Sequence, residues 1–352
     1  MSALYKTALV MIARDEARCI AGSLRSLRPW VDHMIVLDTG SRDGTPDIAR
    51  AEGAVVHAFT WVDDFAAARN AALDLSDADW NIVVDADELL SLGGEALAAL
   101  RHEAPTFVGR IEVCSHYREQ GAGGAGAGAG GAQHSASSRL ARVLPRGVRY
   151  TGRIHEQPVS DLPRRDLPVA LSHDGYLPAQ MATKGERNRR LLEQAVQAAP
   201  GDAYLHYQLG KDHEVHDRLE AALEAYEQAS QLLGPQPGRG PAWRHDLVLR
   251  SLFVLKATGR LAQAVQRAEA ELPLWPDSAD FYFVLGDVLL DFAAAHPEQA
   301  PELVPMIRGA WENCLQIGDN PSLEGTVHGR GSHLAQANLA LLADLLPESG
   351  RG

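Results

Sequence analysis

Two acidic side chains, Asp85 and Asp87, follow directly after an apolar run at residues 80–84. The run has the composition of a buried strand, and the motif that closes it reads Asp85-Ala86-Asp87-Glu88. Carboxylates two residues apart at the end of a strand lie on the same side of the chain. Such a pair offers hard oxygen ligands to a divalent cation, and a cation held by few protein ligands suits the phosphates of a nucleotide substrate. The alternative is that both acids belong to a solvated loop.

Alternating strands and helices determine where this motif lies. The pattern predicts strands at residues 7–13, 33–37, 54–58 and 80–84, and helices at residues 15–27, from Thr45 onwards and at residues 65–75. Thr45 is expected to be the N-cap of the second helix, because Pro46 suits the first helical position. Strands alternating with helices at this spacing predict an α/β fold with a doubly wound, mainly parallel sheet.

Asp38 and Asp85 both come at the carboxyl ends of predicted strands. Ligands of doubly wound sheets bind beside these ends. We therefore expect the loop at residues 38–45, which is rich in acidic residues and glycine, to border the same crevice as the acid pair. In this loop Asp43 could bind a nucleoside, or it could only shape the turn through hydrogen bonds to the local backbone.

Four segments resemble, in the same order, the motifs of family-2 inverting glycosyltransferases with a GT-A fold. They read IARDEA, VLDTGSRDGT, FAAARNAAL and VVDADE, and the resemblance extends over roughly residues 5–180. Two later segments, RIHEQP and SHDGY, are similar to a subgroup with a C-terminal tetratricopeptide half that includes the sublancin-type peptide S-glycosyltransferases. The resemblance implies a nucleotide-diphospho-sugar transferase fold, a nucleotide-sugar donor, usually a UDP-sugar, and a Mg²⁺ or Mn²⁺ ion.

The same resemblance assigns roles to individual residues. Asp85 and Asp87 match the DXD motif, so Asp87 is expected to bind the metal and Asp85 to share the metal or the donor ribose. His173 matches a late histidine of the family and is the expected third metal ligand, the alternative being a hydrogen-bonding loop residue. The residues expected at the donor are Asp38, Ser41, Asp43, Arg69 and Asp85.

Activation of the acceptor is expected from the motif His155-Glu156-Gln157. Inversion needs a base on the far side of the anomeric carbon, and the resemblance places acceptor-side residues at this motif. Glu156 is the expected base. His155 is its rival, because histidine is the side chain that exchanges protons near neutral pH. The alternative is that both residues only order the loop.

From about Met181 the sequence becomes helical and rich in alanine. Several residues fall near the small and large positions of a tetratricopeptide repeat, whose period is about 34 residues: Leu209, Gly210, Ala222, Tyr226, Ala229, Pro235, Leu285 and Gly286. We expect a catalytic domain at residues 1–180 and an all-α, tetratricopeptide-like domain at residues 181–352. Because stacked repeats bind peptides or other copies of themselves, this domain is expected to recruit a peptide or protein acceptor, to form a homodimer, or only to support the catalytic domain.

Residues 121–132 consist only of glycine and alanine. No side chain in this segment is able to pack, so we expect a mobile loop between strands near residues 106–115 and 139–144. The loop could close over the active site, as lids do, or serve only as a spacer.

The composition of the chain indicates which binding partners and which cellular compartment to expect. A net charge of −13 argues against nucleic acid and anionic membranes. The three cysteines are scattered, and neither a membrane span nor a signal peptide is recognisable, so we expect a cytoplasmic enzyme. Two alternatives to a peptide acceptor stay open: a saccharide or lipid-linked sugar of the cell envelope, or an inactive scaffold that binds nucleotide sugars. The donor base and sugar depend on the shape of the pocket, which the sequence does not specify.

Overall fold

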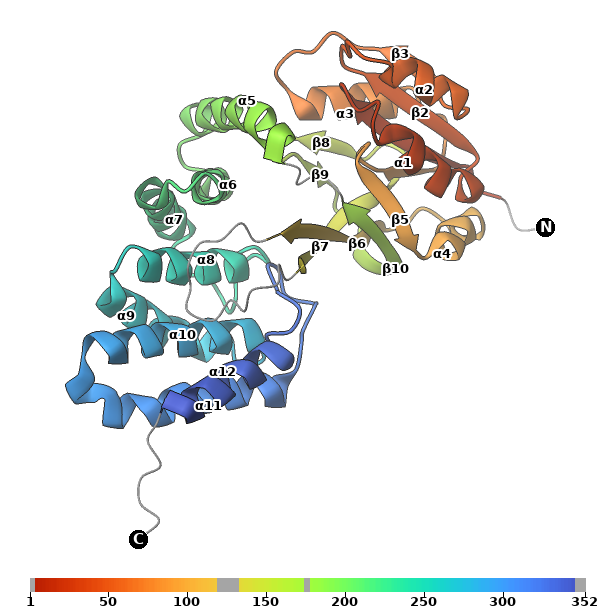
Figure 1. Ribbon diagram of the computed structural model, residues 1–352. Helices are drawn as coiled ribbons and strands as arrows, with labels where there is room; N and C mark the ends of the chain where they lie inside the picture. Colours follow the sequence, from red (N-terminus) through yellow and green to blue (C-terminus); the bar gives the residue numbers. More distant parts are fainter. Residues whose placement is uncertain (1–3, 119–132, 174–177, 346–352) are drawn as a thin grey trace. The chain divides into compact units, whose positions relative to one another are not determined.

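The computed structural model describes residues 4–118, 133–173 and 178–345 (Figure 1). The glycine- and alanine-rich segment at residues 121–132 lies outside these ranges, so its expected role as a lid or spacer stays a prediction. Among the described residues, no helix combines the length and the apolar composition that crossing a bilayer requires.

The chain forms two compact units. The first contains residues 1–133 and 138–195, and the second contains residues 134–137 and 196–352. The division after residue 195 falls inside the long helix α5 (Pro178–Ala198). The first unit contains the sheet and the acidic motif, and the second is built from helices.

An eight-stranded sheet forms the centre of the first unit, in the order β3-β2-β1-β4-β7-β6-β10-β5. Its strands are β1 (Thr7–Ala13), β2 (His33–Asp38), β3 (Val55–Ala58), β4 (Trp80–Val83), β5 (Glu88–Leu92), β6 (Val108–Arg118), β7 (Gln133–Pro145) and β10 (Arg164–His173). Neighbours from β3 to β4 are parallel, β7 pairs antiparallel with β4, β10 pairs parallel with β6, and β5 pairs antiparallel with β10. The prediction of a mainly parallel sheet is confirmed. A separate ribbon consists of β8 (Arg149–Thr151) and β9 (Gln157–Val159).

Helices cover both faces of this sheet, as alternation along β1 requires. Leu9 and Met11 are fully buried in an apolar layer with α1 (Ile20–Leu27), whereas Ala8 and Val10 lie in a second layer with α3 (Phe65–Asp74). Successive side chains of a strand point to opposite faces, so an uninterrupted apolar strand needs cover on both. The first unit also contains η1 (Arg28–Trp30), α2 (Thr45–Ala51), α4 (Gly94–Ala99), η2 (Leu100–His102) and most of α5.

The first helix is shorter than the sequence pattern predicted. We expected it at residues 15–27, but α1 contains only Ile20–Leu27. The backbone N–H of Asp15 donates to Ser41 Oγ (2.9 Å), and that of Glu16 donates to Thr45 Oγ1 (2.7 Å). Asp15 also has a φ of 56°, which a right-handed helix cannot contain. The segment before α1 is therefore bound to the loop after β2 instead of being helical.

The prediction that Thr45 caps the second helix was wrong by one residue. Thr45 is the first residue of α2, and Gly44 is the cap, without a side-chain hydrogen bond. The backbone N–H and the hydroxyl of Thr45 both donate to Asp43 Oδ1, and the hydroxyl oxygen accepts from Glu16. Thr45 thus closes the loop that precedes the helix, a tertiary contact that a local capping rule does not include.

The second unit continues from α5 as successive helix pairs, α6–α7, α8–α9 and α10–α11, followed by α12 (Figure 1). Their bounds are α6 (Ala203–Val215), α7 (Leu219–Leu233), α8 (Arg244–Ala257), α9 (Leu261–Glu271), η3 (Leu272–Leu274), α10 (Ala279–Ala295), η4 (Pro297–Gln299), α11 (Ala300–Ile317) and α12 (His333–Leu345). Asp202 caps α6 and Ser278 caps α10 through their side-chain oxygens.

Small and large residues fit together within these pairs. A methyl group on Gly210 of α6 would come within 2.3 Å of the Tyr226 ring of α7, and one on Gly286 of α10 would come within 2.4 Å of the Trp311 ring of α11. Tyr226 is fully buried. The helices of each pair can approach closely only because these positions lack a side chain. The predicted tetratricopeptide-like architecture is confirmed by this packing.

Candidate active site

The acidic motif forms a tight turn between β4 and β5. The backbone N–H of Glu88 donates to the Asp85 carbonyl (3.1 Å), and the Glu88 carboxylate accepts from the backbone N–H of Asp85 (2.8 Å). Asp85 leaves β4 at its carboxyl end, and Asp38 ends β2, with β1 between these two parallel strands. Both acids therefore lie at the same edge of the sheet, as the sequence predicted.

Two arginines hold the carboxylate of Asp85. Arg69 of α3 donates to Oδ1 and Arg142 of β7 donates to Oδ2, each over 2.8 Å. Arg142 also contacts Glu88 Oε1 at 3.0 Å. Partial burial raises the pKa of Asp85, but the charges of Arg142 and Arg69 together lower it by more, so this carboxylate stays ionised. Burial raises the pKa of Glu88 despite the opposing charge of Arg142.

Arg69 also joins Asp85 to the expected base, since its Nε donates to Glu156 Oε1. The side chains of Arg69 and Glu156 are 8% and 10% exposed, so water screens this ion pair little. α3 is fixed beside β8 because the Asn70 amide exchanges two hydrogen bonds with the Tyr150 backbone (2.8 and 2.9 Å). Burial raises the pKa of Tyr150 to about 12, and its ring lies 5.5 Å from the Arg69 guanidinium.

Two polar atoms of this cluster have no hydrogen-bond partner within the described part of the chain. They are Nη1 of Arg69 and the hydroxyl of Tyr150, and both are buried. Buried polar groups in folded proteins are nearly always hydrogen-bonded, so these two atoms are candidates for contact with a bound group. Arg69 thus binds two carboxylates and still has one nitrogen, Nη1, that donates no hydrogen bond to the described residues.

Asp87 and His173 form the second pair of the site. His173 Nε2 lies 3.4 Å from Asp87 Oδ2, and the last residues of β10 bring His173 opposite Glu88 in the antiparallel pairing with β5. Partial burial lowers the pKa of His173, but its hydrogen bond to Asp87 and the nearby acids raise it by more. The structure thus brings two of the three expected metal ligands together, while Asp85 faces the arginines. Over residues 4–118, 133–173 and 178–345, no three histidine, cysteine or acidic side chains are gathered closely enough to hold a metal ion.

The three predicted donor residues of the loop after β2 bind this loop and the segment before α1. The Asp38 carboxylate accepts from the backbone N–H groups of Gly40 (3.3 Å) and Ser41 (3.2 Å). Ser41 Oγ accepts from Asp15, and Asp43 accepts from Thr45 and from Ala17 (3.1 Å). These contacts support a loop-shaping role, and direct contact with the donor stays a prediction.

His155 and Glu156, the rival bases, have different surroundings although they are adjacent. Both lie between β8 and β9. Glu156 is directed to Arg69, whereas His155 is exposed and has a φ of 50°. A positive φ is uncommon for a residue with a side chain, and it makes the connection between the two strands a sharp turn.

Arg142 and Tyr150 are the parts of the site that were not predicted from the sequence. Arg142 was recognisable only as one of several arginines in a basic stretch. Its neighbours Ala141 and Val143 are buried strand residues, and Arg142 itself is 8% exposed. An arginine inside an apolar strand needs a carboxylate partner, so its position within the pattern was the signal.

Comparisons with known proteins agree with the motifs. Residues 8–120 match Glycosyl transferase family 2, a stretch that contains Asp38, Arg69 and the whole acidic turn but ends before Arg142 and Glu156. TPR repeat-containing protein Synpcc7942_0270 of Synechococcus elongatus is 34% identical over 287 residues, which cover 77% of this chain and 67% of that protein. Glycosyltransferase SunS of Bacillus subtilis, which derives from the SPbeta prophage, is 26% identical over 222 residues, which cover 61% of this chain and 50% of that protein. This chain thus spans about two thirds of the first relative and half of the second.

Two solved structures resemble separate parts of the chain. A glucosyl-3-phosphoglycerate synthase from Mycobacterium tuberculosis, in complex with Mn²⁺ and UDP, is 22% identical and covers 32% of this chain and 43% of that chain, with a TM-score of 0.26. The MamA protein is 16% identical and covers 40% of this chain and 68% of that chain, with a TM-score of 0.32.

The family match, the relatives and the order of elements point in the same direction. The matched stretch carries the parallel strands and the acidic turn, and the relative with repeats covers most of the chain. The chain belongs to glycosyl transferase family 2, with a GT-A catalytic unit followed by a tetratricopeptide-like helical unit.

Proposed function

We propose that this glycosyltransferase moves a sugar from a nucleotide-sugar donor, usually a UDP-sugar in enzymes of this kind, to a side chain of a peptide or protein, with inversion at the anomeric carbon. The observation that carries the proposal is the acidic turn at the carboxyl end of β4, in which Asp85 is held by two arginines and Asp87 lies beside His173. This edge of a doubly wound sheet is where ligands bind.

Asp87 and His173 would hold the divalent metal. One carboxylate oxygen and one imidazole nitrogen at 3.4 Å from each other fit a partial ligand set for Mg²⁺ or Mn²⁺, with donor phosphates expected to complete it. When bound, the metal supplies positive charge that stabilises the departing diphosphate. Asp85, expected from the sequence to share this role, would instead fix Arg69 and Arg142 around the donor.

Arg69 would position the donor. Its Nη1 has no partner among the described residues, while its other nitrogens are fixed by Asp85 and Glu156. A guanidinium whose orientation is already set loses little conformational freedom when it donates to a phosphate or to a sugar hydroxyl.

Glu156 would accept the proton of the acceptor. Its pairing with Arg69 holds the side chain in one orientation, as a base must be held before the reaction. Because Glu156 is directed to Arg69 while the neighbouring His155 is exposed, His155 stays the rival. A thiol acceptor would need the least help from either base to lose its proton, because thiols ionise at a lower pH than hydroxyls.

The peptide acceptor is supported by the similarity to SunS and by the helical unit. The SHDGY and RIHEQP motifs resemble those of the sublancin-type peptide S-glycosyltransferases, and stacked helix pairs commonly bind extended peptides. A cytoplasmic location fits the cysteines, since Cys19, Cys114 and Cys314 form no disulfide with one another.

Thermal unfolding with a panel of nucleotide sugars, in the presence and absence of Mn²⁺, tests the donor. A UDP-sugar should raise the Tm only when Mn²⁺ is present, because ligands that bind the folded state stabilise it by mass action. The sugar identified in this way is then offered with peptides that contain one cysteine or one serine. Transfer to a free monosaccharide at the same rate as to the peptides would contradict the proposed acceptor.

A further inference from the structure

A small cavity lies within the helical unit, away from the acidic turn in the sequence. It has a volume of about 40 Å³ and is lined by Ser230, Leu233, Gly234, Arg244, Leu247, Val248, Arg267 and Glu271. The lining comes from α7, α8 and α9 and from Gly234 at the end of α7. A water molecule needs about 10–15 Å³ by this kind of measure, so the cavity has room for a polyatomic group.

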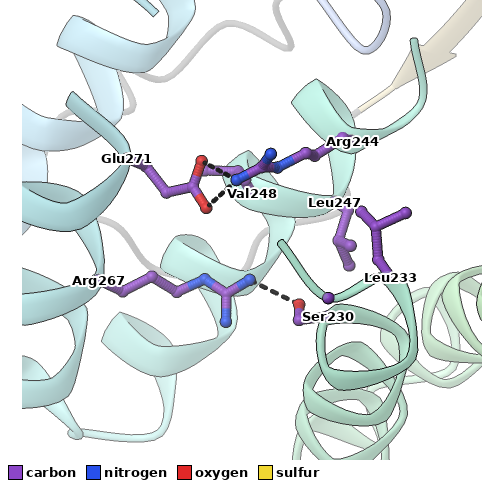
Figure 2. A pocket seen from close by; sticks show the side chains of 8 residues that line it. Ser230, Leu233, Arg244, Leu247, Val248, Arg267 and Glu271 are labelled. Atoms are coloured by element: carbon purple, nitrogen blue, oxygen red, sulfur yellow. Dashed lines mark hydrogen bonds and ion pairs between the residues drawn. The ribbon is translucent and has the colours of Figure 1, made fainter. Parts of the chain in front are cut away.

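Arg267 reaches into this cavity with a positive charge that no acid neutralises directly. Its Nη2 donates to Ser230 Oγ over 2.7 Å, and Figure 2 shows the guanidinium directed at that hydroxyl. Its Nε is buried and has no hydrogen-bond partner within the part of the chain that the structure describes. In the same part of the chain, no carboxylate forms an ion pair with Arg267. Burial lowers the pKa of Arg267, and the more distant charges of Glu271 and Glu227 raise it by less, so these two acids do not fully compensate the buried charge.

The other charges of the cavity are already paired. Arg244 Nη2 contacts both oxygens of Glu271, at 3.0 and 3.2 Å (Figure 2). Trp275 Nε1 also donates to Glu271 Oε2, at 3.1 Å. Ser230 uses its own proton for the Tyr226 carbonyl (2.8 Å), so it accepts from Arg267 but donates elsewhere. Two arginines and one glutamate leave the lining with a net charge of one positive unit.

We propose that this cavity binds a carboxylate group. A singly charged oxyanion would neutralise the unit of charge, and a carboxylate oxygen would accept from the Arg267 Nε that now has no acceptor. Nε and an Nη of arginine form a planar edge that matches the two oxygens of a carboxylate. Leu233, Leu247 and Val248 give the rest of the lining an apolar character, which suits the carbon end of such a group better than a fully solvated ion.

The carboxylate could come from a small free acid or from the end of a polypeptide. Thermal unfolding of the full chain with increasing sodium acetate, at constant ionic strength maintained with the bulky sulfonate MOPS, tests the shared chemistry. The Tm should rise saturably, by about 2–4 °C for a unit of this size. A short peptide with a free C-terminal carboxylate should act like acetate, and its C-terminal amide should not, if the source is a polypeptide. A response to acetate but to neither peptide form assigns the cavity to a small free acid.

Variants make the assignment specific to Arg267. Arg267→Gln and Arg267→Lys should both lose the response to acetate. In MOPS alone, Arg267→Gln should be at least as stable as the wild type, because it removes an uncompensated charge. If Arg267→Gln does not fold, Arg267→Lys, which retains the charge, takes its place in the test. Arg260→Gln is the matched control from the same repeat, since Arg260 pairs with Glu220 at the surface and should keep the wild-type response. Equal shifts in the wild type and both Arg267 variants, or an equal response to chloride and acetate, would overturn the proposal.

Discussion

Asp85 and Asp87 are only two residues apart, yet they have different surroundings in the folded protein. Asp85 is bound by Arg69 and Arg142, whereas Asp87 lies beside His173. At the scale of single residues this division is the main difference between the expected site and the observed one. Because of this difference, we propose Asp87 and His173 as the metal ligands. Asp85 is proposed to orient the two arginines instead.

Arg142 is expected to be essential for stability. Arg142→Gln leaves Glu88 without its arginine and Asp85 with only one, so the free energy of unfolding should fall by about 3–5 kcal/mol, as for other broken buried ion pairs. Urea unfolding measures this loss. The control is Arg149→Gln, because Arg149 pairs with Asp74 at the surface (2.5 Å), and such exposed pairs contribute about 0–1 kcal/mol. Equal losses in the two variants would contradict the buried network.

Glu156 is expected to matter for hydroxyl acceptors more than for thiols. Glu156→Gln keeps the size of the side chain but cannot accept a proton, so transfer to a serine peptide should fall by about 10²-fold or more. Transfer to a cysteine peptide should recover as the pH rises toward about 8.5, because the thiolate then forms without a base.

The matched variant for this test is His155→Gln, which should transfer to both peptides normally. Donor affinity, measured separately, should be unchanged in Glu156→Gln if Arg69 stays in place. Normal transfer to serine by Glu156→Gln at pH 7, with a loss in His155→Gln, would assign the base to His155.

Residue types at strand ends were enough to find the acidic turn, and a resemblance of motifs was enough to nominate Arg69, Glu156 and His173. The partners of those residues were not predictable in the same way. Arg142 is 54 positions from Glu88 along the chain, and no local pattern indicates that they meet. Buried polar networks join distant segments, so only the topology of the sheet brings their members together.

At the scale of elements, local periodicity predicted the strands well and helix starts less well. β1, β2 and β4 agree with the expected ranges to within a residue, because an apolar strand in a parallel sheet is a continuous run. α1 starts later than expected because the backbone N–H groups of Asp15 and Glu16 donate to side chains of the loop after β2. Side chains from another loop determined this boundary, and a periodic pattern contains no information about them.

The close packing of α6 on α7 predicts an unusual response to alanine. Gly210→Ala improves the intrinsic helix propensity, but its methyl group would meet the Tyr226 ring at 2.3 Å. The variant should therefore lose about 1–3 kcal/mol of the free energy of unfolding. Gly309→Ala in α11 is the control, since nothing lies within 4 Å of its added methyl group, and it should gain about 0.5–1 kcal/mol. A stabilised Gly210→Ala in urea unfolding would show that the helices are not packed as described.

At the scale of the whole molecule, each unit has its own apolar core, and only the first contains the predicted catalytic residues. The acidic net charge of −13 fits a protein that does not bind nucleic acid. The change in composition near Met181 led to the expectation of two domains with a boundary at residues 180/181, and this boundary stays a prediction. The acceptor and the oligomeric state were not predictable, because they depend on surfaces that sequence periodicity does not describe.

The helical unit is expected to recruit the acceptor through an apolar surface. Phe253 of α8 is a large apolar side chain that is 47% exposed, so it is accessible to a bound peptide. Phe253→Ser should raise the KM for the peptide acceptor while donor hydrolysis stays unchanged. Leu341→Ser on α12, where Leu341 is 48% exposed, is the matched control. Equal KM values in both variants, for a protein that is monomeric in solution, would leave the helical unit with a supporting role only.

We propose that Asp87 and His173 hold a divalent metal that transfer of the sugar requires. The most direct measurement is the turnover of the nucleotide sugar by the wild type and by Asp87→Asn, each in EDTA and then with excess Mn²⁺. EDTA should abolish wild-type turnover and Mn²⁺ should restore it, whereas Asp87→Asn should stay about 100-fold or more below the wild type with Mn²⁺ present. Asp47→Asn, at an exposed acid of α2, should behave as the wild type throughout. Near-normal turnover in EDTA, or an Asp87→Asn variant that is as active as the wild type, would contradict the account.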